Sequence, residues 1–250
     1  MTAAGSAGGG AGAPDVGHGL VARHTLLSVI AGSRAHGLAT DGSDTDRRGV
    51  YAAPPEAFWR FGKPPDSVEG PLPEQLSWEV ERFCKLCLAA NPTALEVLHS
   101  PLVERRTPLG EELRALAPAF LSRHAYRTFG RYAQRQADRA RARRQADGEV
   151  RWKQPMHLLR LLLTGAVLLE TGRLCVRIAA GEQRERLLAV RRGELTWAEI
   201  DDWRQRLLAR LDRALEHSPL PAEPDTARVE TWLVSVRHRT LGTDNGEALR

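Results

Sequence analysis

Two aspartates one residue apart, Asp44 and Asp46, follow a short loop near the start of the chain. If this segment is a strand, side chains two positions apart point to the same face, so both carboxylates can bind one cation. Such oxygen ligands suit Mg²⁺, which takes one or two protein carboxylates and completes its coordination with water and phosphate oxygens. The spacing predicts a Mg²⁺ site for a phosphorylated substrate, with solvated loop aspartates as the alternative.

A glycine and a serine, Gly32 and Ser33, come about ten residues earlier, directly after an apolar run over residues 26–30. Glycine lets a phosphate approach the backbone closely, and the serine hydroxyl and neighbouring N–H groups can bind its oxygens. The segment "GSRAHGLATDGSDTDRRGV" therefore combines a phosphate-binding turn with a pair of metal-binding carboxylates.

Polar residues also recur within an apolar segment of the second half, "KQPMHLLRLLLTGAVLLETG". Lys153, His157, Arg160 and Thr164 are separated by four, three and four positions, which places them on one face of a helix. The surrounding leucines predict burial, and buried cations need partners. A triphosphate or metal-bound carboxylates would supply them, and acids of a neighbouring helix are the alternative.

Arginines at four-residue spacing form a stripe on a second helical segment. They are Arg123, Arg127, Arg131, Arg135 and Arg139, with Tyr126, Phe129 and Tyr132 nearby. Like charges four positions apart destabilise an isolated helix by about 0.2–0.5 kcal/mol per pair, so an RNA backbone could compensate them. The alternative is a solvated helix whose aromatics face the core and whose arginines pair with acids.

The elements that position these residues predict an α+β fold. The N-terminal half mixes short strands with helices, including a proline-rich loop over residues 54–73, whereas the C-terminal half is helical throughout. We expect an N-terminal core with a small mixed or antiparallel sheet and flanking helices, followed by an all-helical domain. The predicted division is a disordered tail over 1–22, a catalytic domain over 23–116, a substrate-binding domain over 117–240 and a disordered tail over 241–250.

The composition narrows the class of protein. The chain has 250 residues, 42% of them apolar, and a net charge of +5. No run approaches the roughly 18 consecutive apolar residues of a membrane span, so we expect a soluble cytoplasmic protein without a membrane partner. Its three cysteines include a lone C-x-x-C at Cys84 and Cys87, on the apolar face of a predicted helix, which favours core thiols over a zinc or redox site.

The chain resembles the nucleotidyltransferases of the DNA polymerase beta superfamily, whose signature is a Gly-Ser turn followed by a D-x-D strand. It is most similar to the bacterial RlaP branch, associated with RNA repair, which carries Gly-Ser-Arg-Ala, an aromatic or histidine, Gly, and then Ser-Asp-x-Asp-x-Arg-Gly-Val. Further matches in "WEVERFCKLCLAANPTALEVLHS" and "KQPMHLLRLLLTGAVLLETGRL" extend the resemblance over roughly residues 24–200.

The resemblance implies two Mg²⁺ ions, about 3.5–4 Å apart, held by three carboxylates. Asp44 and Asp46 would bridge them, and the third ligand would be Glu79, with Glu81 as the alternative in "SWEVERF". The residues that the resemblance implies in nucleotide binding are Gly32, Ser33, Arg34, His36, Ser43, Lys153, His157 and Arg160.

The sequence therefore predicts a Mg²⁺-dependent enzyme that transfers a nucleoside monophosphate from an NTP to an acceptor hydroxyl. RNA or tRNA would suit the basic helices as acceptors. The alternatives are a non-catalytic module that binds nucleotides or RNA, and an antitoxin-like nucleotidyltransferase that modifies a partner protein.

Overall fold

The structure, a computed structural model, describes residues 13–130 and 152–242. A five-stranded mixed sheet occupies the N-terminal half, in the order β3-β4-β2-β1-β5. Its strands are β1 (Thr25–Ile30), β2 (Arg47–Tyr51), β3 (Ser67–Glu69), β4 (Gln75–Glu79) and β5 (Val103–Arg106). The architecture confirms the α+β prediction.

The directions of the strands decide which residues share an end of the sheet. β1 pairs antiparallel with both β2 and β5, and β3 pairs antiparallel with β4. By contrast, β2 and β4 are parallel, with Arg47 opposite Gln75 and Tyr51 opposite Glu79. The residues that precede β2 therefore lie at the end of the sheet where β4 begins.

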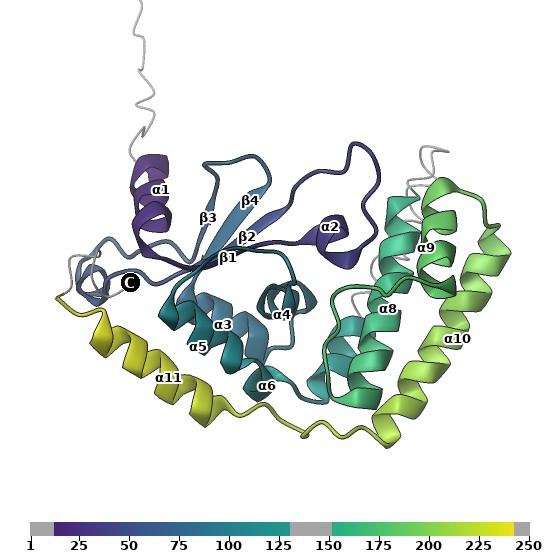
Figure 1. Cartoon of the computed structure of the whole chain (residues 1–250). Helices are drawn as coiled ribbons and strands as arrows, with labels where there is room; N and C mark the ends of the chain where they lie inside the picture. Colours follow the sequence, from purple (N-terminus) through teal and green to yellow (C-terminus); the bar gives the residue numbers. More distant parts are fainter. Residues whose placement is uncertain (1–12, 131–151, 243–250) are drawn as a thin grey trace, which may run out of the picture.

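Helices cover the sheet and continue beyond it (Figure 1). Beneath the sheet lie α3 (Val80–Leu88), α4 (Pro92–His99), α5 (Pro108–Ala115) and α6 (Ala117–Phe120). Gly110 of α5 packs so closely on β1 that a Cβ there would come 2.2 Å from the Leu26 carbonyl oxygen. The sequence "SWEVERF" enters α3 directly from β4, as predicted, and Asn91 caps α4 through the Ala94 amide.

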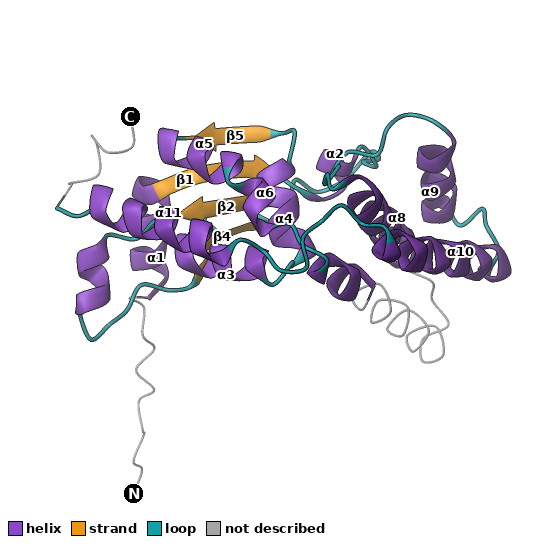
Figure 2. Cartoon of the chain, turned by 90° about the horizontal axis from the view of Figure 1, so that it is seen from below, coloured by secondary structure: helices purple, strands orange, loops and turns teal. Residues whose placement is uncertain are grey.

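The second group of helices comprises α8 (Lys153–Thr171), α9 (Glu182–Arg192) and α10 (Trp197–Glu216). Figure 2 shows these three helices beside the end of the sheet that carries the short helix α2 (Gly32–His36). The last helix, α11 (Thr226–Arg239), returns to pack against α3 and α6. No helix in the described ranges is long and apolar enough to span a membrane.

Two details differ from the sequence-based expectations. Residues 13–22 belong to helix α1 (Ala13–His24), where a disordered tail was predicted, because Val21 is buried against the sheet and its carbonyl accepts from the Thr25 hydroxyl. The proline-rich loop contains a 3₁₀ helix, η1 (Pro55–Trp59), and strand β3.

Cys84 and Cys87 are buried in α3, as expected of core thiols, and burial raises the pKa of Cys84 to about 12.

Candidate active site

The Gly-Ser turn brings the end of β1 against the segment before β2. The Ala31 amide donates to the Asp46 carbonyl oxygen at 2.8 Å, and α2 begins at the next residue. Gly32 has a φ of +62°, in the left-handed region that favours glycine. A Cβ on Gly32 would lie 2.0 Å from Oδ2 of Asp46, so glycine leaves the space that this carboxylate occupies.

The two aspartates lie directly before β2 and differ in their surroundings. Asp46 is half-buried, forms an ion pair with Arg48 at 3.5 Å and lines a pocket. Asp44 is exposed, and its carbonyl oxygen accepts from Nε of Arg34 at 3.3 Å. Asp46 is therefore the carboxylate directed at the pocket, and Asp44 is not among the residues that line it.

Arginines hold the loop between α2 and β2 in place. Arg34 donates to the Ser43 carbonyl oxygen at 2.9 Å, and Arg191 of α9 donates to the Leu38 carbonyl oxygen at 2.9 Å. The Ser43 hydroxyl accepts from the Thr40 amide at 2.9 Å. Arg34 and Ser43, which were predicted to bind nucleotide, thus shape the loop and lie outside the pocket lining.

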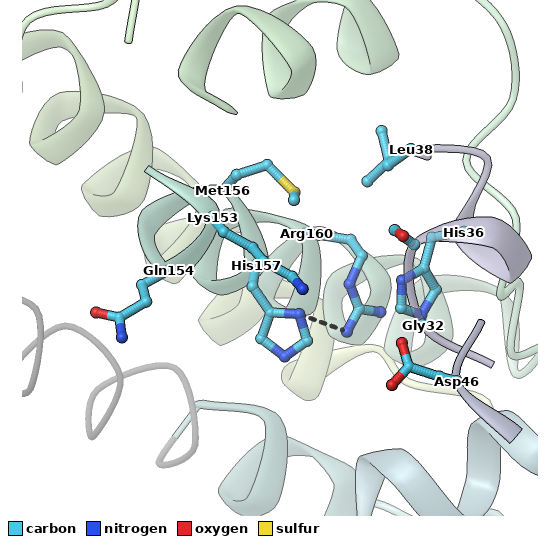
Figure 3. Close-up of a pocket in the computed structure, with 10 residues that line it drawn as sticks. Gly32, His36, Leu38, Asp46, Lys153, Gln154, Met156, His157 and Arg160 are labelled. Atoms are coloured by element: carbon cyan, nitrogen blue, oxygen red, sulfur yellow. Dashed lines mark hydrogen bonds between the residues drawn. The ribbon is translucent and has the colours of Figure 1, made fainter. Parts of the chain in front are cut away.

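The pocket has a volume of about 390 Å³ and lies between α2, Asp46 and α8 (Figure 3). Its size falls within the range of small-ligand sites. It is lined by Gly32, Ser33, His36, Leu38, Asp46, Lys153, Gln154, Met156, His157 and Arg160. The structure therefore brings together residues predicted from two distant segments of the sequence.

Three of the four residues in the predicted polar seam of α8, Lys153, His157 and Arg160, line this pocket, whereas Thr164 is buried in the helix and is not among the lining residues. Lys153 is exposed at one end of the seam, whereas Arg160, one turn further than His157, is only 1% exposed. Nδ1 of His157 lies 3.5 Å from Nη2 of Arg160. Leu38 and Met156 also line the pocket and add apolar surface beside these basic groups.

The anionic partner of Arg160 is Glu96 of α4, a residue that the sequence analysis missed. One carboxylate oxygen of Glu96 accepts from Nη1 of Arg160, and the other lies 3.0 Å from Nε2 of His36. Burial alone would raise the pKa of the Glu96 carboxyl, but Arg160 and His36 outweigh it and lower this pKa to about 2. The sequence left two partners open for Arg160, a bound triphosphate or an acid of a neighbouring helix. The structure shows the second of these, Glu96 of α4.

His36 and His157 are both neutral in this arrangement. Burial, followed by the Arg160 charge, lowers the pKa of His36 and lowers that of His157 to about 3. Since ionised Glu96 can only accept, His36 donates to it from Nε2. The cluster of Glu96, His36, His157 and Arg160 thus ties α2, α4 and α8 together at the pocket.

We expect this cluster to make the protein less stable in acid. A histidine whose folded pKa lies below the unfolded value of 6.5 contributes stability above pH 6.5, which is lost as the pH falls toward the folded value of about 3. Within residues 13–130 and 152–242, the charged and titratable groups that act on His157 include Arg160, Glu96, His36 and Lys153. The variant His157→Gln should flatten the pH dependence of the unfolding free energy over that range by up to about 1.4 kcal/mol per pH unit.

Urea titrations at several pH values measure this slope. The matched control is His217→Gln, at the exposed C-terminal end of α10. Equal slopes for His157→Gln and the control would contradict a half-buried, neutral His157.

Glu79 does not join the pocket. It lies opposite Tyr51 at the far end of β2, about 16 Å of strand away from Asp46. Its buried carboxylate caps α3 through the Glu81 amide at 2.7 Å and pairs with Arg237 of α11 at 2.8 Å. The structure contradicts the prediction that Glu79 shares a metal with Asp46, and the alternative, Glu81, pairs with Lys85 beside it.

The arginine stripe lies only partly within the described residues. Arg123 and Arg127 are exposed, while Arg131, Arg135, Arg139 and Tyr132 lie outside the described ranges. Phe129 is buried, and the Tyr126 hydroxyl donates to Asp212 of α10 at 2.8 Å. These two aromatics therefore pack against the protein, as the alternative to RNA stacking predicted, and the binding of RNA by the arginines stays a prediction.

The carboxylates near the pocket could hold only part of the coordination shell of a metal ion. No group of three or more His, Cys, Asp or Glu side chains with the geometry of a metal site occurs within residues 13–130 and 152–242. Asp46 with Asp44 supplies at most two carboxylates. That set fits Mg²⁺, which accepts one or two protein carboxylates when water and substrate phosphates complete its shell.

Comparison with known proteins agrees with this geometry. The model of the RlaP family, described as the RNA repair pathway DNA polymerase beta family, matches residues 18–235. The chain belongs to this family. The match confirms the resemblance seen in the sequence and covers both the Gly-Ser to Asp46 segment and α8, the two parts of the chain that line the pocket.

Two individual relatives add context. The uncharacterized protein YcgL of Bacillus subtilis (strain 168) is 32% identical over 95 residues, a segment that covers 36% of this chain and 36% of that protein. A nucleotidyltransferase-like protein from Exiguobacterium sibiricum 255-15 is 14% identical, with 88% of this chain and 76% of that chain covered and a TM-score of 0.29. A TM-score this low supports no conclusion about this chain.

Proposed function

We propose that this RlaP-family chain is a Mg²⁺-dependent nucleotidyltransferase that transfers a nucleoside monophosphate from an NTP to an acceptor hydroxyl, with RNA as the acceptor. The observation that supports this most is the pocket of about 390 Å³, with the Asp46 carboxylate on one side and Lys153, His157 and Arg160 of α8 on the other. A metal-binding acid facing basic side chains is the arrangement that a metal–triphosphate requires.

The residues of the metal side fit this proposal. Asp46 would hold the metal, Asp44, two residues earlier, would be the second carboxylate, and Gly32 leaves the space for Asp46. Bound Mg²⁺ would supply charge neutralisation for the triphosphate and activation of the acceptor hydroxyl. Ser33, which lines the same pocket, can donate its hydroxyl to a phosphate oxygen.

The three residues of α8 that line the pocket have different roles. Lys153 is exposed at the pocket, and no carboxylate of the described residues forms an ion pair with it, so its charge is available to phosphate. His157 is neutral and can donate one hydrogen bond. Arg160 is already neutralised by Glu96 and mainly fixes the wall of the pocket.

We expect Lys153→Ala to raise the NTP dissociation constant about tenfold, which corresponds to about 1.4 kcal/mol. The melting temperature should change little because the side chain is exposed. Calorimetric titration with a non-hydrolysable NTP and Mg²⁺ measures the binding. The control is Lys85→Ala, whose ammonium lies on α3 and pairs with Glu81. Equal NTP affinity in Lys153→Ala and the control would refute the assignment of this pocket to NTP.

A further inference from the structure

The segment after η1 displays two aromatic rings to solvent. Trp59 is 72% exposed and Phe61 is 108% exposed, the highest values among the large apolar side chains of the described residues. The two rings are two residues apart in the chain, and large aromatic side chains exposed this fully are available for contact with a ligand. Their place in the fold is separate from the pocket, because η1 follows the far end of β2 from Asp46.

The chain on either side of the rings is anchored, at Phe58 on one side and at Lys63 and Pro65 on the other. The Arg237 guanidinium of α11 lies over the Phe58 ring at 4.5 Å. The Tyr51 hydroxyl donates to the Pro65 carbonyl oxygen, and Nζ of Lys63 donates to that of Phe58. A preorganised surface loses less conformational entropy when it binds a ligand.

Two cations accompany the rings. Arg60 and Lys63 are exposed, and no carboxylate within the described residues comes within ion-pair distance of either. Glu56, the acid that precedes the rings, accepts from the Gly242 amide instead. Aromatic rings can stack on the flat bases of a nucleic acid, and cations without acidic partners can pair with its phosphates. The alternation of the two kinds of side chain therefore matches a single-stranded nucleic acid.

We propose that residues 59–63 form a docking surface for single-stranded RNA, in which bases stack on Trp59 and Phe61 while phosphates pair with Arg60 and Lys63. Stacking on aromatic side chains with a cationic track is how proteins bind single strands without a sequence requirement. The role as an acceptor-binding surface rests on the proposed function. The surface lies about 16 Å of strand or more from Asp46, so an acceptor would have to span several nucleotides to reach both.

The test is fluorescence anisotropy of a labelled 12-nucleotide oligoadenylate RNA with the full chain, without NTP or Mg²⁺. Trp59→Ala and Phe61→Ala should each weaken binding at least about fivefold. Arg60→Gln and Lys63→Gln should each lower the slope of log affinity against log salt by about 0.7. The controls, Leu72→Ala and Arg213→Gln, change an exposed apolar residue and an exposed cation elsewhere and should leave both quantities unchanged.

The contrary results are equally specific. RNA affinity that is unchanged in the aromatic variants, or absent in the parent chain, would overturn the proposal. Two other results would also overturn it, each with RNA binding intact in Trp59→Ala. One is that this variant loses a self-association that sedimentation detects in the parent chain, and the other is that it loses binding to anionic vesicles. NTP titrations of the same variants separate this proposal from the proposed function, because the pocket residues are untouched and NTP affinity should be preserved.

Discussion

Asp46→Asn should abolish nucleotidyl transfer, by at least about 100-fold, and leave the protein folded. The change removes the charge of the carboxylate that lines the pocket while keeping its shape. A loss of about 3 kcal/mol of transition-state stabilisation gives a decrease of this size. The ion pair of Asp46 with Arg48 is half-exposed at 3.5 Å, so its loss should change the unfolding free energy by less than about 1 kcal/mol.

The control for Asp46→Asn is Glu79→Gln, which changes the acid predicted to be the third metal ligand. That variant weakens the buried bond to Arg237 and the cap of α3, so it should lower the melting temperature while the folded fraction keeps its transfer activity. Transfer rates and melting curves of both variants, at matched Mg²⁺ and NTP, give the answer. The opposite pattern, with activity lost only in Glu79→Gln, would contradict the placement of the metal at Asp46.

Glu96→Gln should destabilise the protein by about 3–5 kcal/mol, because it leaves the Arg160 guanidinium buried without its counter-charge. The double variant Glu96→Gln, Arg160→Met should recover much of that loss, since removing both charges of a buried pair is often nearly neutral. Urea unfolding of Glu96→Gln, Arg160→Met and the double variant measures the coupling energy between the two side chains. Additive effects of the two changes would contradict a direct pair.

The same pair predicts an acid-dependent loss of stability. The folded pKa of Glu96, about 2, lies below the ordinary value of 4.5 for a glutamate, so its contribution to stability is fully present above pH 4.5. That contribution is lost as the pH falls from 4.5 toward 2. Glu96→Gln should lose this part of the pH dependence, whereas Glu170→Gln, a change in the partly exposed pair with Arg210, serves as the surface control.

Much of the site was predictable because its signals are local. The segment from Gly32 to Asp46 is one short helix and one loop between β1 and β2, with Asp44 and Asp46 directly before β2 rather than on the predicted strand. The seam of Lys153, His157 and Arg160 depends only on helical periodicity. Both patterns survive in the structure, and both face the same pocket. What the sequence could not predict was which buried anion Arg160 would meet.

The errors arose where the answer depends on distant pairing. Glu79 was placed with Asp46 because the family resemblance implies a third carboxylate on a later strand and "SWEVERF" offered it. The structure puts it elsewhere: β4 runs parallel to β2, so Glu79 at the end of β4 lies at the opposite end of the sheet from Asp46, which precedes β2. The sequence did contain a partial signal for Glu96, since it is an acid with Leu95, Val97 and Leu98 beside it in an apolar stretch. An acid buried there needs a cationic partner, but nothing local in the sequence identifies that partner as Arg160 of α8.

The most direct test of the proposed function compares two labels of the same nucleotide. The chain is incubated with RNA, Mg²⁺ and NTP that carries ³²P at either the α or the γ phosphate, and the RNA is then isolated and digested with nuclease. We expect that α label enters nuclease-sensitive RNA, that γ label leaves as pyrophosphate, and that Asp46→Asn transfers neither. Retention of γ label on the RNA, or α label that appears equally with Asp46→Asn, would refute the proposed function.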